Sequence, residues 1–246
     1  MKAVIIAAGC GSRLKDHHQG IPKSLLQIHG KTIIDDIIGK ISDAEIKEIV
    51  VITGYQSDIL KEYLSKFNDS EVKIQCIDNP RWEDANGISV LCAKESISEY
   101  EQFILLMSDH LFSAEILHQI VKMDIDKDEG LLALDFKIDQ IPDLDDGMKI
   151  QCYKVSNSLY RINRFGKQLT EFKAIDTGIF KLNYSFFKIL EKSIESGKTS
   201  LSDACNLLSE DGKILGLDIK DALWLDIDTP EMLDQQKILN KLLNER

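Results

Sequence analysis

The sequence contains few of the features that indicate a linker, a disulfide framework or a membrane span. Its 246 residues include only four prolines, which are scattered, and no low-complexity tract or internal repeat, so we expect one domain over 1–246. The five cysteines lie far apart without a C-x-x-C pair, which argues against disulfides and a zinc site. No apolar run approaches the roughly 20 residues of a membrane span, and no targeting segment is visible, so we expect a cytoplasmic protein.

Basic residues are also scarce in this sequence. It has 30 Lys and Arg residues against 41 Asp and Glu residues, and its formal net charge is −11. Nucleic acids and anionic membranes both need a basic surface, so the charge argues against either as a partner. Basic residues that do gather in one segment are therefore informative about a phosphate ligand.

What is present is a glycine-containing turn within the first segment, Lys2 to Leu26. Its apolar run over 3–8 predicts a buried strand, and the letters GCGSR follow directly. Gly9 and Gly11 allow the backbone to turn tightly and to bring its N–H groups against an anion without an intervening side chain. Arg13 and Lys23 add positive charge, so the segment is typical of a triphosphate-binding loop.

Two more common glycine loops fit less well. A dinucleotide fingerprint needs a third glycine where Leu14 stands, and an acidic residue at the end of the second strand, where Thr53-Gly54 is found. Gly30-Lys31-Thr32 ends like a P-loop, but Leu25 occupies the place of its first glycine. A glycine turn without a ligand would not explain the two nearby cations.

The same segment resembles a known family. AAGCGSRL followed by PKSLL is similar to the signature LAAGxGxRLxxxxPKxL of the nucleotidyltransferases that activate phosphorylated sugars and alcohols. The resemblance implies an α/β fold, with a Rossmann-like, mostly parallel mixed sheet flanked by helices and a small antiparallel excursion. It implies that Arg13 and Lys23 are catalytic, through charge neutralisation. It also implies nucleotide contacts from Ala8, Gly9, Gly11 and Ser12.

Strands and amphipathic helices alternate along the chain, which predicts crossover connections and a largely parallel sheet. Strands are expected over 48–53, 72–78, 103–107 and 131–136, and helices over 31–43, 56–67, 113–123, 184–196, from Ser200, and over 230–243. Residues 137–165 predict an antiparallel excursion over an acceptor pocket, with Asp145-Asp146 as a solvated turn. We therefore expect 1–136 to be the nucleotide-binding half and 137–246 to be the acceptor-binding half with the final helix.

Two candidate segments follow expected strands at the edge where open α/β sheets place ligands. A plain turn would explain Asn86-Gly87 equally well, but the resemblance to the branch that makes CDP-alcohols makes both residues candidates for contact with the base. Asp109 follows the strand 103–107, and a carboxylate that faces a phosphate loop is costly unless a cation lies between them. The family places a Mg²⁺ ligand here. His110 is expected to be a neighbour of the ion rather than a ligand, because magnesium prefers oxygen.

The second half supplies the remaining candidates through the same resemblance. Lys167 is expected to hold the phosphate of the acceptor, although an ordinary surface lysine is an alternative. Asp176 is expected to bind a hydroxyl group, and Thr177 and Gly178 to line the acceptor pocket. The tract WLDIDTPE resembles the second metal-site motif of the family, with Asp226 and Asp228 on the same face of a strand. Both aspartates are candidate ligands, and Asp228 is slightly favoured.

The resemblance implies a Mg²⁺-dependent cytidylyltransferase whose partners are CTP and a phosphorylated small alcohol, inositol 1-phosphate first. Many relatives in that branch carry a membrane phosphatidyltransferase-like domain behind this one, and none follows here by Arg246. Phosphocholine, aminoalkylphosphonates and glycerol-type phosphates therefore stay open as acceptors, as do sugar 1-phosphates with UTP. A relative that binds nucleotide without catalysis is a further alternative, and the sequence is compatible with a homo-oligomer.

Overall fold

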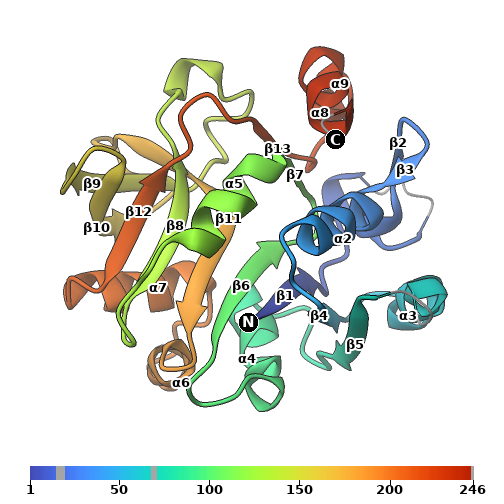
Figure 1. Cartoon of the computed structure of the whole chain (residues 1–246), viewed down its shortest axis with the longest axis horizontal. Coiled ribbons are helices and arrows are strands. Elements are labelled where there is room, and N and C mark those ends of the chain that lie inside the picture. Colours follow the sequence, from blue (N-terminus) through green and yellow to red (C-terminus); the bar gives the residue numbers. More distant parts are fainter. Residues whose placement is uncertain (15–19, 68–70, 245–246) are drawn as a thin grey trace.

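One mixed sheet organises the fold, and both halves of the chain contribute strands to it (Figure 1). The computed structural model describes residues 1–14, 20–67 and 71–244. Within these ranges, the nine strands of the sheet are β1 (Lys2–Ala7), β4 (Glu48–Thr53), β5 (Lys73–Asp78), β6 (Gln102–Met107), β8 (Gly130–Asp135), β9 (Lys149–Lys154), β10 (Leu159–Phe165), β11 (Ala174–Asn183) and β12 (Ile214–Asp218). Their order across the sheet is β5-β4-β1-β6-β11-β8-β12-β10-β9.

The directions of the strands confirm the expected mixed, mostly parallel sheet. The strands β5, β4, β1 and β6 are parallel neighbours, whereas β11 runs antiparallel to both β6 and β8. The strand β12 is again parallel to β8, and β10 is antiparallel to β12 and β9. The pair β9 and β10 is the antiparallel excursion that was expected over 137–165.

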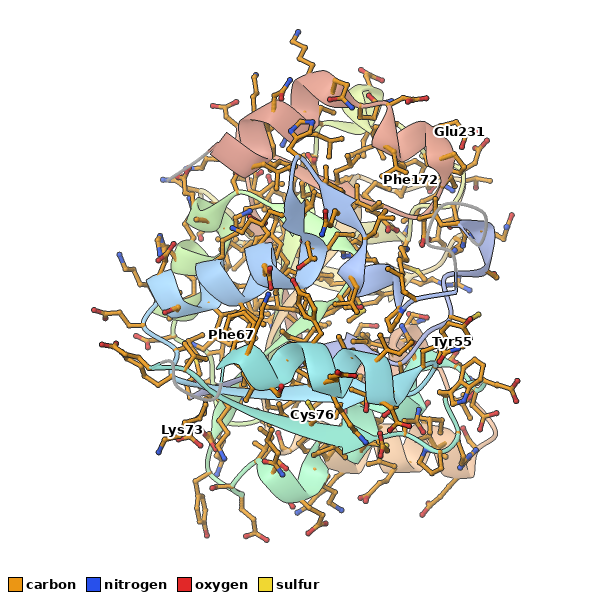
Figure 2. All side chains as sticks on the ribbon, turned by 90° about the vertical axis from the view of Figure 1, so that its right-hand side faces the viewer. Tyr55, Phe67, Lys73, Cys76, Phe172 and Glu231 are labelled. Carbon is orange, nitrogen blue, oxygen red and sulfur yellow. The ribbon has the colours of Figure 1, made fainter. Side chains whose placement is uncertain are left out.

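Helices cover both faces of the sheet because successive side chains of its strands point to opposite sides. On β1, Ala3 and Ile5 belong to one apolar core, and Val4 and Ile6 belong to the other. The first core includes side chains of α2 (Ile33–Asp43), α3 (Ser57–Leu64), α5 (Ala114–Lys122) and α9 (Gln236–Asn244), and the second those of α4 (Asn86–Cys92), α6 (Phe186–Glu195) and α7 (Leu201–Glu210). Figure 2 views the edge of the sheet, where α3 lies across β5 beside Cys76.

Capping explains where several helices begin. The predicted helix 31–43 starts at Ile33, because Lys31–Thr32 forms the short strand β3, which pairs with β2 (Gln27–Ile28). Thr32 then caps α2, since its hydroxyl accepts a hydrogen bond from the N–H of Asp35. The expected helix start at Ser200 is confirmed as a capping box with Asp203.

The final helix predicted over 230–243 is not continuous. It divides into α8 (Pro230–Leu233) and α9, because the N–H groups of Asp234 and Gln235 bond to carbonyls three residues back rather than four. Among the described residues, no helix combines the length and the hydropathy that crossing a bilayer requires.

A second, two-stranded sheet brings distant segments together at the edge of the main sheet. The strand β7 (His110–Phe112) pairs antiparallel with β13 (Trp224–Asp226), and this register places Asp226 opposite His110. The backbone N–H of Ile227 continues the contact by bonding to the carbonyl of Asp109. The two predicted metal-binding segments are therefore held side by side by main-chain hydrogen bonds.

Candidate active site

The glycine loop after β1 is shaped by close packing against a lysine stem. Gly11 has a φ of 57°, and a Cβ atom on it would lie 3.0 Å from the Cβ of Lys23. A larger residue would therefore be strained and would also displace Lys23. The carbonyl of Ala8 accepts a hydrogen bond of 2.9 Å from the N–H of Tyr55, which fixes the start of the loop. The part of the predicted segment over 15–19 lies outside the described residues.

Lys23 lies among the three aspartates that were predicted as metal ligands. Its side chain is almost fully buried, and its Nζ lies 2.9 Å from Asp109 and 3.9 Å from Asp226, and donates a hydrogen bond to Asp228. Burial opposes the charge of the ammonium group, but the carboxylates, Asp109 first, outweigh it and raise the pKa of Lys23 above its ordinary value. Burial likewise opposes ionisation of Asp109, yet Lys23 lowers the pKa of that carboxyl to about 2.

His110 and Asp226 form the deeper part of this cluster. The Nε2 atom of His110 lies 3.4 Å from Asp226, and burial raises the pKa of the Asp226 carboxyl. Burial also opposes protonation of His110, but Asp226 raises the pKa of the imidazole to about 9. Within the ranges that the structure describes, Nδ1 of His110 and Oδ1 of Asp226 are buried without a hydrogen-bond partner.

These side chains could hold a metal ion. Ligand atoms of Asp109, His110 and Asp226 all lie within 4.8 Å of one another. The carboxylate oxygens are the donors that a hard cation prefers, and the unpartnered Oδ1 of Asp226 is a buried acceptor that a cation would satisfy. Asp228 lies beyond the end of β13, and its hydrogen bond from Lys23 keeps it in the same cluster.

A smaller cavity of about 310 Å³ lies directly over the glycine loop. Its walls include the predicted residues Gly9, Gly11, Ser12, Arg13, Lys23, Asn86, Asp109 and Asp228. A Cβ atom on Gly9 would meet nothing within 4 Å, so the backbone here is open to close approach by a ligand. Ala8 and Gly87 are not among the residues that line this cavity.

Asn86 and Gly87 open helix α4 rather than forming a free turn, which corrects the expected local structure. The Asn86 side chain accepts a hydrogen bond of 2.9 Å from the N–H of Leu201 and so joins α4 to the start of α7. A Cβ atom on Gly87 would lie 2.4 Å from the carbonyl oxygen of Thr199, so glycine is required by this helix contact. Contact of either residue with a base stays a prediction.

The sequence analysis missed Trp82 in the wall of the smaller cavity. A Cβ atom on Gly54 would lie 2.4 Å from the Cβ of Trp82, so the absence of a side chain on Gly54 lets the tryptophan approach the glycine loop. The ring of Trp82 meets that of Tyr55 edge to face, with centroids 5.6 Å apart. Thr53-Gly54 entered the sequence reasoning only as a failed dinucleotide motif, so no local signal marked this contact.

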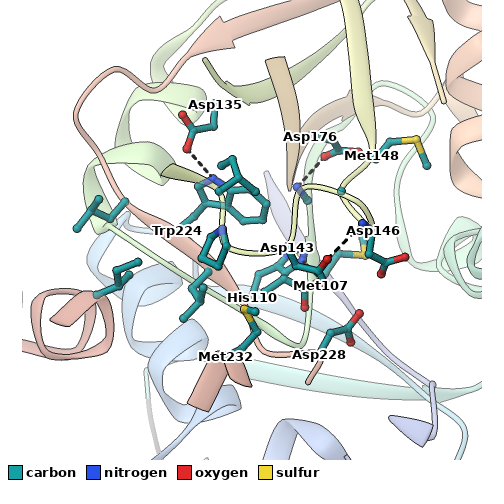
Figure 3. Close-up of a pocket in the computed structure, with 18 of the residues that line it drawn as sticks. Met107, His110, Asp135, Asp143, Asp146, Met148, Asp176, Trp224, Asp228 and Met232 are labelled. Carbon is teal, nitrogen blue, oxygen red and sulfur yellow. Dashed lines mark hydrogen bonds and ion pairs between the residues drawn. The ribbon is translucent and has the colours of Figure 1, made fainter. Parts of the chain in front are cut away.

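A larger cavity of about 520 Å³ adjoins the smaller one, and Arg13, Asn86, Met107 and Asp228 line both. Figure 3 shows His110, Asp146, Asp176 and Trp224 around it. The predicted residues Lys167, Asp176, Gly178 and Asp226 lie in its walls. Thr177 does not line this cavity. Side chains alternate between the two faces of β11, so Thr177 points away from the face of Asp176 and Gly178, and its buried hydroxyl donates a hydrogen bond to the carbonyl of Ala133.

The strand β11 is irregular where it reaches the larger cavity. Its register with β8 shifts between Asp176 and Phe180, and Gly178 within that shift has a φ of 75°. A Cβ atom on Gly178 would lie 2.2 Å from Nδ1 of His110, so only glycine leaves room for the imidazole. The N–H of Gly178 donates a 2.7 Å hydrogen bond to Asp176, while burial raises the pKa of the Asp176 carboxyl to about 6.

Asp146 was not predicted as a site residue. It lies in the expected charged turn, but its partly exposed side chain forms two ion pairs. One of its oxygens accepts a 2.7 Å hydrogen bond from Arg13, and the other accepts a 2.5 Å bond from Lys167. Lys167 is therefore not an isolated surface lysine. Arg13 also lies 3.3 Å from Asp228.

Trp224 forms a wall of the larger cavity. Its indole N–H donates to Asp135 at 2.9 Å, and Lys137 lies 2.9 Å from the same carboxylate. The ring meets His110 edge to face, with centroids 5.6 Å apart. The cavity thus combines an aromatic wall with carboxylates and lysines, a combination suited to a small, polar ligand with carbon–hydrogen faces.

The chain is similar to one protein family and to several characterised proteins. The sequence model of the family described as nucleotidyl transferase matches residues 2–237. A bifunctional IPC transferase and DIPP synthase from Aquifex aeolicus is 28% identical over 237 residues, 96% of this chain and 50% of that protein. Its counterpart from Archaeoglobus fulgidus is 31% identical over 234 residues, 94% of this chain and 42% of that protein.

Other relatives carry different names. A bifunctional protein GlmU from Methanococcus maripaludis is 31% identical over 255 residues, 100% of this chain and 56% of that protein. The chain spans about half the length of these curated relatives. The solved inositol-1-phosphate CTP transferase from T. maritima is similar with a TM-score of 0.82 and 22% identity, covering 99% of this chain and 96% of that one. A solved UDP-glucose pyrophosphorylase complexed with UDP-glucose has the same TM-score at 17% identity, covering 100% of this chain and 99% of that one.

Proposed function

The chain belongs to the nucleotidyl transferase family, and from that premise we propose that it transfers CMP from CTP to a phosphorylated small alcohol, releasing pyrophosphate. Inositol 1-phosphate is the first acceptor we propose. The names of the IPC transferase relatives and of the T. maritima CTP transferase support this choice. The observation that carries the proposal is the common wall of the two cavities, where Arg13 and Asp228 face both.

The smaller cavity would hold the nucleotide. The open backbone at Gly9 and the cations Arg13 and Lys23 suit the phosphates of CTP. Trp82 offers an aromatic face beside them, and stacking on such a face favours a nucleobase whatever its hydrogen-bonding pattern. We propose that the base lies against Trp82 rather than against Gly87, whose open side is filled by the loop before α7.

The larger cavity would hold the acceptor. Lys167 would bind the acceptor phosphate near Arg13, and Asp176 would bind a hydroxyl group; both line this cavity. The ring of Trp224 would pack against the carbon–hydrogen face of a polyol. Gly178 would contribute to the form of the cavity and not to a contact with the ligand, because its lack of a side chain makes room for His110 in the same wall.

We propose Mg²⁺ as the cofactor, with Asp109, Asp226 and Asp228 as the residues that would hold it. The three carboxylates and the unpartnered Oδ1 of Asp226 fit a hard cation with oxygen ligands. Such an ion would supply Lewis acidity at the α-phosphate and offset its negative charge. His110 is better suited to hold Asp226 in place, because its charge and its 3.4 Å contact both stabilise that carboxylate.

The chemistry needs no nucleophile or general base from the protein. An oxygen of the acceptor phosphate, which is already anionic, would form a bond to the α-phosphorus while the bond from that phosphorus to the bridging oxygen of pyrophosphate breaks. Lys23 would offset the charge on the α-phosphate, and Arg13 with the amides of the loop would hold the departing pyrophosphate. The residues of the chain would thus act by positioning two anions and neutralising their repulsion.

The test is pyrophosphate release in the presence of Mg²⁺, with CTP or UTP against a panel of acceptors. The panel contains inositol 1-phosphate, phosphocholine, 2-aminoethylphosphonate, glycerol 3-phosphate and glucose 1-phosphate. We expect release with CTP and inositol 1-phosphate, and a loss of about a hundredfold or more in turnover for Asp109→Asn, the usual scale for a preorganised charge. Circular dichroism controls for folding of the variant.

Other outcomes of this assay would correct the proposal at defined points. Release with a different alcohol phosphate would show that the proposed acceptor is wrong, whereas the proposed reaction would stand. Release with UTP and glucose 1-phosphate would favour the activity named in the UDP-glucose pyrophosphorylase likeness. If nucleotide binds but no acceptor gives pyrophosphate, the chain is a nucleotide-binding relative without catalysis.

A further inference from the structure

Asp146 joins two cations that the proposed function assigns to different substrates. Arg13 follows β1 and lines both cavities, whereas Lys167 follows β10 and lines only the larger one. The Asp146 carboxylate gives one oxygen to each of them, at 2.7 Å and 2.5 Å. The bond to Arg13 joins residues 133 positions apart in the sequence, and Arg13 lines both cavities.

The carboxylate of Asp146 accepts hydrogen bonds from two cations, as a phosphate group can. A phosphate group that bridges a guanidinium and an ammonium group also offers a separate oxygen to each. Although burial opposes its charge, hydrogen bonds from Lys167 and Arg13 lower the pKa of the Asp146 carboxyl, so this group is an anion at neutral pH. An anion in this position competes with any phosphate for the same two donors.

Neither cation depends on Asp146 for its place in the fold. Lys149 fixes the backbone beside Lys167, since its Nζ donates to the Lys167 carbonyl at 2.7 Å and its own carbonyl accepts from the N–H of Gly166 at 3.0 Å. Arg13 belongs to the short helical turn Ser12–Leu14, which closes through a backbone bond from Leu14 to Gly11. Removing the carboxylate would therefore leave the backbone of both cations in place, and Arg13 would keep its 3.3 Å contact with Asp228.

The segment that carries Asp146 can release it without unfolding a strand. Asp146 lies in a turn between the 3₁₀ turn Ile138–Gln140 and β9, and its N–H bonds locally to the side chain of Asp143 at 3.3 Å. The N–H of Gly147 bonds to the Asp143 carbonyl at 3.2 Å, so the turn is held from within. A rotation of the Asp146 side chain breaks only the two ion pairs.

We propose that Asp146 is an internal anion that occupies the phosphate-binding donors of Arg13 and Lys167 in the free enzyme and leaves them when substrate phosphates enter. The inference rests on the proposed function, because it takes both cations as phosphate ligands. Asp146 thereby weakens phosphate binding. Its negative charge also offsets the positive charge of the two cations while the site is empty. The exchange is inexpensive, because ion pairs between partly exposed groups such as these are weak.

The test is calorimetric titration of inorganic pyrophosphate into the wild-type protein, Asp146→Asn and Asp145→Asn. Asparagine keeps the shape of the side chain and removes its charge. Asp145 is the matched control, because it is exposed, lies next to Asp146 in the sequence and carries the same charge. Lys149 bonds to its backbone carbonyl and not to its carboxylate. We expect Asp146→Asn to bind pyrophosphate roughly three- to tenfold more tightly than Asp145→Asn, the scale of two weak ion pairs. Asp146→Ala should behave in the same way.

Equal or weaker binding by Asp146→Asn relative to Asp145→Asn would overturn the inference. Weaker binding would mean that the carboxylate positions the cations instead of competing for them. Arg13→Gln separates this failure from a failure of the proposed function. If Arg13→Gln weakens pyrophosphate binding while Asp146→Asn does not strengthen it, the phosphate assignment stands and only the internal anion is wrong. If Arg13→Gln changes nothing, the phosphate assignment itself is wrong.

Discussion

Replacing Asp176 by asparagine should make the protein more stable at neutral pH while weakening acceptor binding. The carboxyl group lines the larger cavity, and burial raises its pKa from 3.8 to about 6. Because the folded pKa lies above the unfolded one, the fold favours the protonated form. The stabilisation is complete below pH 4 and is lost as the pH rises through 6. Asparagine imitates the protonated form and can still accept the hydrogen bond from Gly178.

The magnitude follows from the difference between the two pKa values. A rise from 3.8 to about 6 corresponds to about 3 kcal/mol of folding free energy that the wild-type protein loses between pH 4 and pH 7.5. Asp176→Asn lacks this titration, so its stability relative to the wild type should increase by about 3 kcal/mol across the same interval. This value is an upper figure, because the carboxyl group is partly open to the water of the cavity.

The measurement is urea unfolding of wild type and Asp176→Asn at pH 4, 5, 6 and 7.5. Subtracting one unfolding free energy from the other at each pH cancels the contributions of titrating groups that both proteins share. Asp145→Asn, at an exposed position, is the control and should show a flat difference. If the difference for Asp176→Asn is also flat, the carboxyl is not desolvated and the reasoning fails. In the functional assay the variant should raise the KM for the acceptor and leave the KM for CTP unchanged.

Two further substitutions test the shape of the site. Gly178→Ala should lower stability by about 2–4 kcal/mol, since the new Cβ would lie 2.2 Å from His110 at a positive φ. Gly212→Ala, at a similar φ of 65° but in open space, should cost only about 1–2 kcal/mol; equal losses in denaturant titrations would refute the steric argument. Trp82→Leu should weaken CTP binding by about 1–3 kcal/mol and leave acceptor binding intact. Because Trp82 and Trp224 are the two tryptophans of the sequence, fluorescence of the remaining Trp224 should respond to the acceptor; a Trp82→Leu protein with unchanged CTP affinity would exclude base stacking.

The convergence of the phosphate loop and Asp109 on one edge of the sheet could be predicted because it depends on strand direction. The strands β1 and β6 are parallel neighbours, with Ile6 opposite Met107, so the segments that follow them leave the same edge of the sheet. Lys23 is then 2.9 Å from Asp109. Because parallel strands end at the same edge of a sheet, the sequence predicts that both segments reach this edge. That β6 lies beside β1, although β4 and β5 come between them in the chain, is seen only in the fold.

The interior orientation of Thr177 could also have been found from the sequence. It lies between Asp176 and Gly178 on a strand, and a period of two places it on the opposite face. The resemblance to a Thr-Gly motif gave it a role in the pocket, whereas its hydroxyl donates to Ala133 inside the sheet. Alternation within a strand was the better guide to its side chain here.

Asp146 and Trp82 could not be predicted, because tertiary contacts alone mark them. The charged turn around Asp146 has the composition of a solvated turn, and its partners Arg13 and Lys167 are 133 and 21 positions away. Trp82 depends on the absence of a side chain at Gly54, on a different strand-to-helix connection. Similarly, the Asn86 side chain at the start of α4 accepts its hydrogen bond from the N–H of Leu201, more than a hundred positions later.

The balance of charge where the two cavities meet bears on how an acidic protein would bind the polyanionic substrates proposed above. Lys23, Arg13 and Lys167 each form an ion pair with a carboxylate, and His110 lies beside Asp226. Because these basic side chains already face carboxylates, a phosphate would gain affinity where an internal carboxylate gives up its donor or where an added cation takes the carboxylate instead. The proposed release of Asp146 provides the first route, and the proposed Mg²⁺ on the aspartates around Lys23 provides the second. Both routes free basic side chains only when substrate is present, which keeps the empty site close to neutral.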